Sequence, residues 1–128
     1  MKIIFKKKKI SKNLTIDNII FDSKFEGNYY LYLKNKVANS EITNLIVHPT
    51  YEIQETFKIG KRSFKNMVYT PDFHYIKDGV IYYIECKGWQ TDIYMMRKKL
   101  FIYKYVRGKK CSFIQVNQGK KNTEWHNV

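Results

Sequence analysis

Asp72, Glu85 and Lys87 are the residues whose types and spacing suggest chemistry. Two carboxylates directly opposite each other on a sheet repel, which weakens the pairing and raises the pKa of one of them. A cation held between them would remove both costs. With a lysine on the same patch, the three residues suggest a metal site.

A β-hairpin over residues 69–88 would bring these side chains together. Asp78-Gly79 favours a type I′ turn, which needs positive φ at both central residues. The flanking segments are rich in Tyr, Ile, Val and Phe, which suit a pleated surface. With Asp78 and Gly79 as the two loop residues, Lys77 pairs with Val80.

This register places Asp72 directly opposite Glu85. Side chains alternate along a strand, so Lys87 shares the face of Glu85, while Cys86 points to the other face and into the core. A simpler interpretation is also open, in which the carboxylates are solvated and Lys87 is their ion-pair partner. The agreement between the turn, the strand pattern and the helix that follows favours the metal site.

Pro71-Asp72 followed by Glu85-Cys86-Lys87 resembles the signature of the PD-(D/E)XK nuclease superfamily. The resemblance covers about residues 18–105. Phe21–Glu26 resembles the acidic motif of the first helix in that group. Three further segments resemble a small phage-borne branch that includes enzymes similar to Holliday junction resolvases: Lys87-Gly88, Thr91 and Tyr94–Phe101.

The resemblance implies an α/β fold with a restriction-endonuclease-like αβββαβ core, in which helices flank a mixed sheet. It also implies that the Cys86 carbonyl and Glu26 join Asp72 and Glu85 at the metal. Magnesium suits this chemistry because it prefers oxygen ligands and keeps several waters, and manganese is expected to substitute. Lys87 would orient the attacking water or stabilise the developing charge.

Glu26 has a second interpretation. Ser23-x-x-Glu26 is a capping box, in which the Glu side chain folds back onto the amide of the helix N-cap residue. The two roles are compatible if Ser23 caps the helix while Glu26 turns towards the metal.

The chain carries 24 Lys and Arg against 11 Asp and Glu, a formal charge of +13. An AT-rich genome explains the preference for lysine over arginine, but it does not explain the shortage of acids. The excess favours a polyanionic partner, and nucleic acid is the usual one. The candidate DNA-binding residues are Lys6, Lys7, Lys8, Lys9, Lys61, Arg62, Arg97 and Lys98.

Other classes of protein fit the sequence poorly. No apolar run approaches the roughly 20 residues needed to cross a bilayer, and no signal peptide is evident. Cys86 and Cys111 are therefore expected to be reduced thiols in the cytoplasm. The three histidines are scattered and form no zinc pattern with the cysteines. We expect neither a membrane partner nor a nucleotide cofactor.

The 128 residues predict one domain, with a basic N-terminal arm over residues 1–17 and a loose polar tail over residues 117–128. Helices are expected over residues 24–37 and from Thr91 or Asp92 to about residue 106. The apolar face of the second helix should pack on the sheet through Ile93, Met96, Leu100 and Tyr103. The expected strands cover residues 45–47, 51–59, 64–76, 80–87 and 111–116, with a turn at residues 60–63.

These observations favour a metal-dependent endonuclease acting on DNA. By resemblance, branched DNA such as a Holliday junction is one substrate and a homodimer one assembly. The rival hypothesis is a nuclease fold that binds DNA without cutting it. A third, an RNA-binding or regulatory protein, rests on charge alone.

Overall fold

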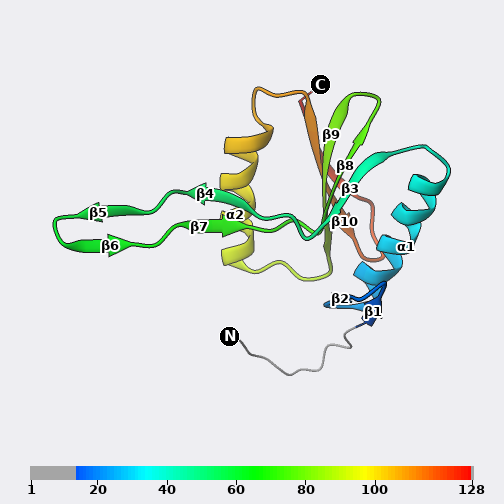
Figure 1. The fold of residues 1–128 in the computed structure, drawn as a ribbon, viewed down its shortest axis with the longest axis horizontal. Coiled ribbons are helices and arrows are strands. Elements are labelled where there is room, and N and C mark those ends of the chain that lie inside the picture. Colours follow the sequence, from blue (N-terminus) through cyan, green and yellow to red (C-terminus); the bar gives the residue numbers. More distant parts are fainter. Residues whose placement is uncertain (1–13, 128) are drawn as a thin grey trace.

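The computed structural model of the protein describes residues 14–127 and shows an α/β fold around a five-stranded sheet. The strands lie in the order β11 (Thr123–Asn127), β10 (Cys111–Asn117), β9 (Val80–Lys87), β8 (Phe73–Lys77) and β3 (Thr43–Val47). β9 and β10 are parallel and the other neighbours are antiparallel. Helices α1 (Lys24–Ala38) and α2 (Asp92–Phe101) cover opposite faces (Figure 1). The predicted class, an α/β fold with a mixed sheet between helices, is confirmed.

The β8–β9 hairpin has the predicted register, with Lys77 opposite Val80 and Phe73 opposite Ile84. Asp78 and Gly79 form the turn, with φ of 51° and 77°. Positive φ at both central positions is the geometry that makes Asp-Gly a strong hairpin signal. The ladder ends at Phe73, so Asp72 lies in a bend immediately before the strand.

The face of the sheet under α1 is covered by Phe21, Tyr30 and Leu33, which pack on Phe73 and Ile84. Phe21 closes a small hairpin of β1 (Leu14–Ile16) and β2 (Ile19–Phe21) that precedes the helix. Residues 14–16 of the predicted basic arm therefore form a strand, which corrects that boundary. The lysines at positions 6–9 lie outside the described residues.

The opposite face is covered by α2, but not by the side chains that the sequence predicted. Ile93, Met96, Leu100 and Tyr103 are exposed, so this prediction is wrong. Tyr94 and Phe101 are buried instead. Aromatic rings bury more apolar area, and the hydroxyl of Tyr94 keeps a hydrogen bond to Gln115 at 2.7 Å.

A π-helical segment, η1 (Ile102–Val106), continues α2 to the predicted end of that helix. Neither described helix is long and apolar enough to span a membrane.

The C-terminal segment is ordered, which corrects the predicted loose tail. β11 pairs with β10, and the ring of Trp125 packs edge-on against Phe113 with centroids 5.6 Å apart. An aromatic residue at the edge of the core is therefore what anchors the last strand.

Between β3 and β8 the chain makes a long excursion that replaces the single strand predicted for residues 51–59. β4 (Tyr51–Gln54) pairs with β7 (Met67–Tyr69) and packs beside α2. Beyond this pair, β5 (Phe57–Ile59) and β6 (Arg62–Phe64) pair around Gly60 and Lys61, a tighter turn than the predicted residues 60–63. We call residues 55–66 the projecting hairpin, because it extends far from the body (Figure 1).

Candidate metal centre

The starts of α1 and β8 and the ends of β3 and β9 lie together beside the sheet and carry the candidate site. Asp72 lies just before β8, and Glu85 and Lys87 lie at the end of β9. Glu26 is in the first turn of α1, and His48 directly follows β3. Because β3 and β9 both pair with β8 in antiparallel fashion, their last residues meet the start of β8.

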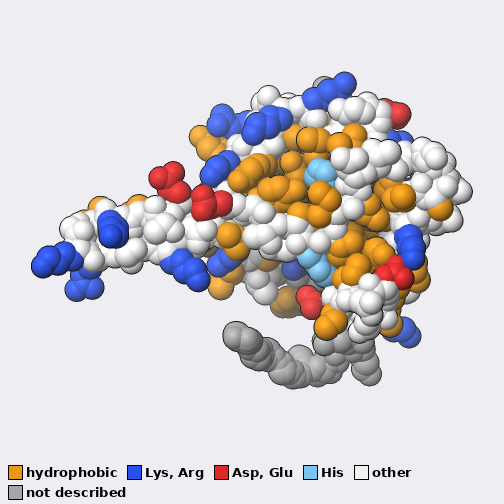
Figure 2. Space-filling model, viewed as in Figure 1, with side chains coloured by type: hydrophobic (Ala, Val, Ile, Leu, Met, Phe, Trp, Pro, Cys, Tyr) orange, Lys and Arg blue, Asp and Glu red, His pale blue; other side chains and the backbone are white. Residues whose placement is uncertain are grey.

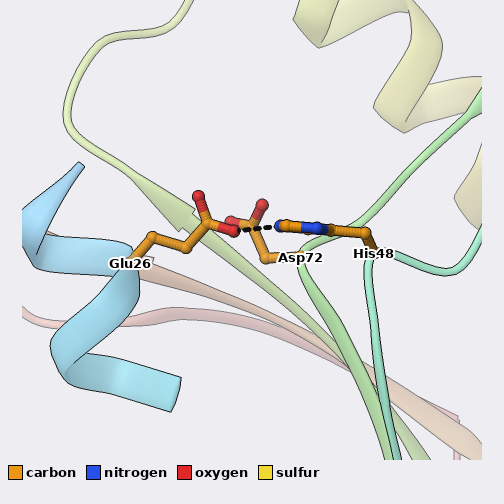
Figure 3. A group of neighbouring side chains, drawn as sticks. All are labelled: Glu26, His48 and Asp72. Carbon is orange, nitrogen blue, oxygen red and sulfur yellow. Dashed lines mark hydrogen bonds and ion pairs between the residues drawn. The ribbon is translucent and has the colours of Figure 1, made fainter. Parts of the chain in front are cut away.

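Glu26, His48 and Asp72 form the most compact group of metal-ligating side chains among the described residues. Each offers one ligand atom, and these atoms lie within 4.8 Å of one another. Nε2 of His48 is 2.6 Å from Oε2 of Glu26. Figure 3 shows the three side chains pointing towards a common centre from the helix and the two strand ends.

The backbone fixes Asp72 within this group. Its amide donates to the carbonyl of Ile84, and its own carbonyl accepts from the amide of His48, both at 2.9 Å. The amide of Cys86 donates to Oδ2 of Asp72 at 2.7 Å. Two of these hydrogen bonds fix the backbone of Asp72, and the third orients its carboxylate.

Glu85 lies on the neighbouring flank, outside the group of three. The hydroxyl of Tyr69 donates to its Oε1 at 2.6 Å, and Nζ of Lys87 lies 3.7 Å from its Oε2. The ammonium of Lys87 also lies 4.0 Å from the ring centre of Tyr94. Lys87 is therefore placed beside the carboxylates by an ion pair and a cation–π contact.

Burial makes this concentration of negative charge costly. Glu26 and Glu85 are 4% and 6% exposed. Burial, reinforced by the charges of Glu85 and Glu26, raises the pKa of Asp72 well above its usual range. Burial also raises the pKa of Glu85, although the Tyr69 hydrogen bond and the Lys87 charge oppose that rise.

For His48, the surroundings favour the charged form of the side chain. Its hydrogen bond to Glu26 raises the pKa of the imidazole, and burial opposes the rise. The protonated ring is thus stabilised by the carboxylate beside it, and a proton and a cation would compete for this place in the site.

The structure shows one half of the predicted capping box, the half that Ser23 supplies. Oγ of Ser23 accepts from the Glu26 amide at 3.1 Å and caps α1. The Glu26 side chain accepts from the amide of Asp22 at 3.4 Å, one residue before the N-cap, and its second oxygen faces His48. The helix is capped by Ser23 while Glu26 turns inward.

His48 is the site residue that sequence reasoning missed, because the three histidines are scattered along the sequence and show no pattern of metal ligands. The usable signal was its position directly after an apolar strand. Once β3 pairs antiparallel with β8, as Val47 does with Phe73, the next residue must lie beside Asp72. That pairing joins segments far apart in sequence, and no local pattern specifies it.

Cys86 has the predicted orientation. Its side chain packs against the core under α1, on the face away from Glu85, and burial raises the pKa of the thiol. Its amide touches Asp72. Whether the carbonyl ligates a metal stays a prediction.

The predicted DNA-binding residues fall into separate places. Lys61 and Arg62 lie at the tip of the projecting hairpin. Arg97 donates to the carbonyl of Val68 at 2.9 Å, and Lys98 donates to Gln115 at 3.0 Å. Both contacts attach α2 to the rest of the fold, and the assignment of these two residues to DNA binding stays a prediction.

The donor set fits a divalent cation. Asp72 and Glu26 offer carboxylate oxygens, the ligands that magnesium and manganese prefer, and Glu85 adds a third carboxylate nearby. The imidazole of His48 suits manganese or a later transition metal better than magnesium. The raised pKa values of Asp72 and Glu85 show that their ionised forms are destabilised in the folded protein, and a bound cation would relieve this electrostatic cost.

Comparisons with known proteins place the chain in a family without assigning a function. No curated protein matches the sequence significantly. A solved structure described as "Crystal structure of SSO0001" is 11% identical, with a TM-score of 0.40, over 79% of this chain and 50% of that one. The chain thus spans about half the length of that protein. A family model described as "Protein of unknown function (DUF1064)" matches residues 6–121, and the chain belongs to this family.

Proposed function

We propose that the protein is a metal-dependent endonuclease that hydrolyses phosphodiester bonds in DNA. The observation that carries the proposal is the group of Glu26, His48 and Asp72, whose ligand atoms lie within 4.8 Å of one another. The buried carboxylate of Glu85 and the ammonium of Lys87 lie on its neighbouring flank. Carboxylates that serve only solubility lie in water. Here they are buried together against the electrostatic cost, as expected of a cation site.

The order of the elements supports the proposal. α1, β3, β8, β9, α2 and β10 follow one another in the αβββαβ order implied by the resemblance to PD-(D/E)XK nucleases. In that interpretation β4–β7 are an insertion and β11 is an addition at the edge of the sheet. The signature residues Asp72, Glu85 and Lys87 then stand at the ends of adjacent strands.

The residues divide the chemical work between them. Asp72, Glu26 and His48 would hold the cation, with Glu85 as a further carboxylate. A bound divalent cation supplies positive charge that polarises the phosphate and lowers the pKa of the attacking water. Lys87 lies where it can orient that water and neutralise the charge that develops on the phosphate. Tyr69 fixes the orientation of Glu85.

The substrate panel that tests this proposal contains linear duplex, single-stranded and four-way-junction DNA, each with magnesium, manganese or chelator. We expect cleavage with either metal and none with chelator, and preference for the junction would support a structure-selective enzyme. Binding without cleavage under every metal condition would contradict the proposal and favour a catalytically silent DNA-binding module.

A further inference from the structure

The projecting hairpin lies outside both hydrophobic cores. Every residue of β5 and β6 is exposed, and the stacked rings of Phe57 and Phe64, 4.8 Å apart, are the main side-chain contact between the strands. A two-stranded hairpin is only marginally stable on its own. An element that adds so little to the core is expected to serve a partner.

The base of the hairpin is braced. The amide of Asn66 donates to Oγ1 of Thr56 at 3.1 Å, and its side chain donates to Glu52 at 2.8 Å. These bonds bridge the gap between the β4–β7 and β5–β6 pairs. Gly60, with φ of 60°, allows a two-residue turn at the tip. The hairpin is therefore built as a continuous two-stranded extension.

Beyond Glu55 at its base, the charged residues of the hairpin are all basic. Residues 57–66 contain Lys58, Lys61, Arg62 and Lys65 and no acidic residue. Figure 2 shows basic side chains towards the tip of the hairpin and acidic ones at its base. Two such hairpins from different copies would repel each other, which argues against self-association through this element. The complementary surface is a polyanion.

The hairpin is also joined directly to the candidate metal centre. The segment that carries it, residues 49–71, begins immediately after His48 and ends immediately before Asp72. Within this segment, β4 and β7 pack beside α2 and only the hairpin projects (Figure 1). Oγ1 of Thr50 lies 3.0 Å from Oγ1 of Thr70 at the root. An extended strand rises about 3.3 Å per residue, so Gly60 lies up to about 33 Å from the root, about one turn of B-DNA.

We infer that the projecting hairpin enters the major groove of duplex DNA and holds the duplex against the metal centre. The major groove is about 12 Å wide and accommodates a two-stranded β-ribbon. The corresponding groove of duplex RNA is too narrow for side chains to read. This inference rests on the proposed function in that DNA is taken as the substrate, and it adds the element that positions this substrate.

The test compares two charge variants with equal loss of charge. The hairpin variant carries Gln in place of Lys58, Lys61, Arg62 and Lys65. The control variant carries Gln in place of Lys77, Lys104, Lys109 and Lys110, exposed lysines near the opposite ends of β8 and β10. All eight side chains are exposed, so both variants are expected to fold, which thermal melting checks.

Fluorescence anisotropy in chelator then measures affinity for duplex DNA and duplex RNA at several salt concentrations. The hairpin variant should bind DNA at least about tenfold more weakly than the control variant. Its plot of log affinity against log salt should be shallower than that of the control variant by up to about 3.6, since each of the four lost phosphate contacts removes about 0.9. Equal weakening in both variants would overturn the inference, as would equal dependence on the hairpin for duplex RNA.

A second measurement locates the contact directly. A photo-crosslinker on Ser63→Cys should capture metal-free duplex DNA, whereas the same group on Lys110→Cys should not. Crosslinks only from Lys110→Cys, or capture of a second copy of the chain by Ser63→Cys, would overturn the inference. Both measurements omit metal. A wild type that binds through its hairpin but never cuts would therefore contradict the proposed function alone, and cutting without use of the hairpin would contradict this inference alone.

Discussion

Nε2 of His48 lies 2.6 Å from Oε2 of Glu26, although the first residue directly follows a strand and the second lies in the first turn of a helix. This contact joins α1 to the sheet at the point where Asp72 and Glu85 also meet. Its partners are an imidazole and a carboxylate, so the same two atoms can share a proton or face a cation.

Replacing His48 by Ala should weaken manganese binding more than magnesium binding, because imidazole is a better ligand for manganese. Loss of this ligand should lower manganese affinity at least about tenfold, because mutation of a residue that only hydrogen-bonds to a metal ligand already lowers metal affinity by about that factor. Calorimetric titration of both ions measures the difference. The matched control is His126→Asn, at the far edge of the sheet. Unchanged manganese affinity in His48→Ala would remove His48 from the ligand set.

The raised pKa values predict an unusual pH dependence for the metal-free protein. Native Asp72 and Glu85 keep protons that the unfolded chain releases from about pH 4 upward. The native state therefore binds more protons, and the free energy of unfolding falls as pH rises through the native pKa values. His48, whose pKa is also raised, acts in the same direction above its unfolded value.

Asp72→Asn should therefore raise the Tm of the metal-free protein at pH 8, by about 4 °C if it removes about 1 kcal/mol of repulsion. The Asn side chain still accepts from the Cys86 amide, so the local backbone is kept. Asp78→Asn, at the other end of the same hairpin, is the control, because Asn tolerates its positive φ. A metal-free Asp72→Asn protein that melts below wild type at pH 8 would show that the carboxylates do not repel as described.

The β8–β9 hairpin was predictable because its register follows from a local signal, the Asp78-Gly79 turn. The caps at Ser23 and Thr91 were predictable for the same reason. His48 was not, because its proximity to Asp72 depends on the pairing of β3 with β8 across a long insertion. The prediction of the buried face of α2 was wrong because periodicity places Ile93 and Tyr94 on adjacent faces and does not decide between them. Gln115 on the sheet, which accepts a hydrogen bond from the Tyr94 hydroxyl, favours burial of Tyr94.

Substitution of Lys87 distinguishes an enzyme from a binding module. In the proposed enzyme, Lys87→Ala should lower the rate of cleavage about 10²–10³-fold while magnesium binding stays nearly unchanged, because lysine does not ligate a hard cation. Lys87→Arg should also fail, since a planar guanidinium does not replace a compact ammonium between Glu85 and the Tyr94 ring.

Single-turnover cleavage and metal titration on the same preparations measure both effects. Lys77→Ala, at the far end of the same hairpin, is the control for lost positive charge. Cleavage near the wild-type rate by Lys87→Ala would assign this lysine to the surface charge of a binding module.

Single-turnover cleavage by Glu85→Gln and Asp72→Asn shows whether the buried carboxylates hold the cation that cleavage requires. Each substitution keeps the shape of the side chain and removes one negative charge, and Asp78→Asn again serves as the control. Both pocket variants should bind DNA as wild type does but lose metal-dependent cleavage, whereas Asp78→Asn should cut normally. Cleavage at the wild-type rate by either pocket variant would mean that its carboxylate holds no cation needed for the reaction.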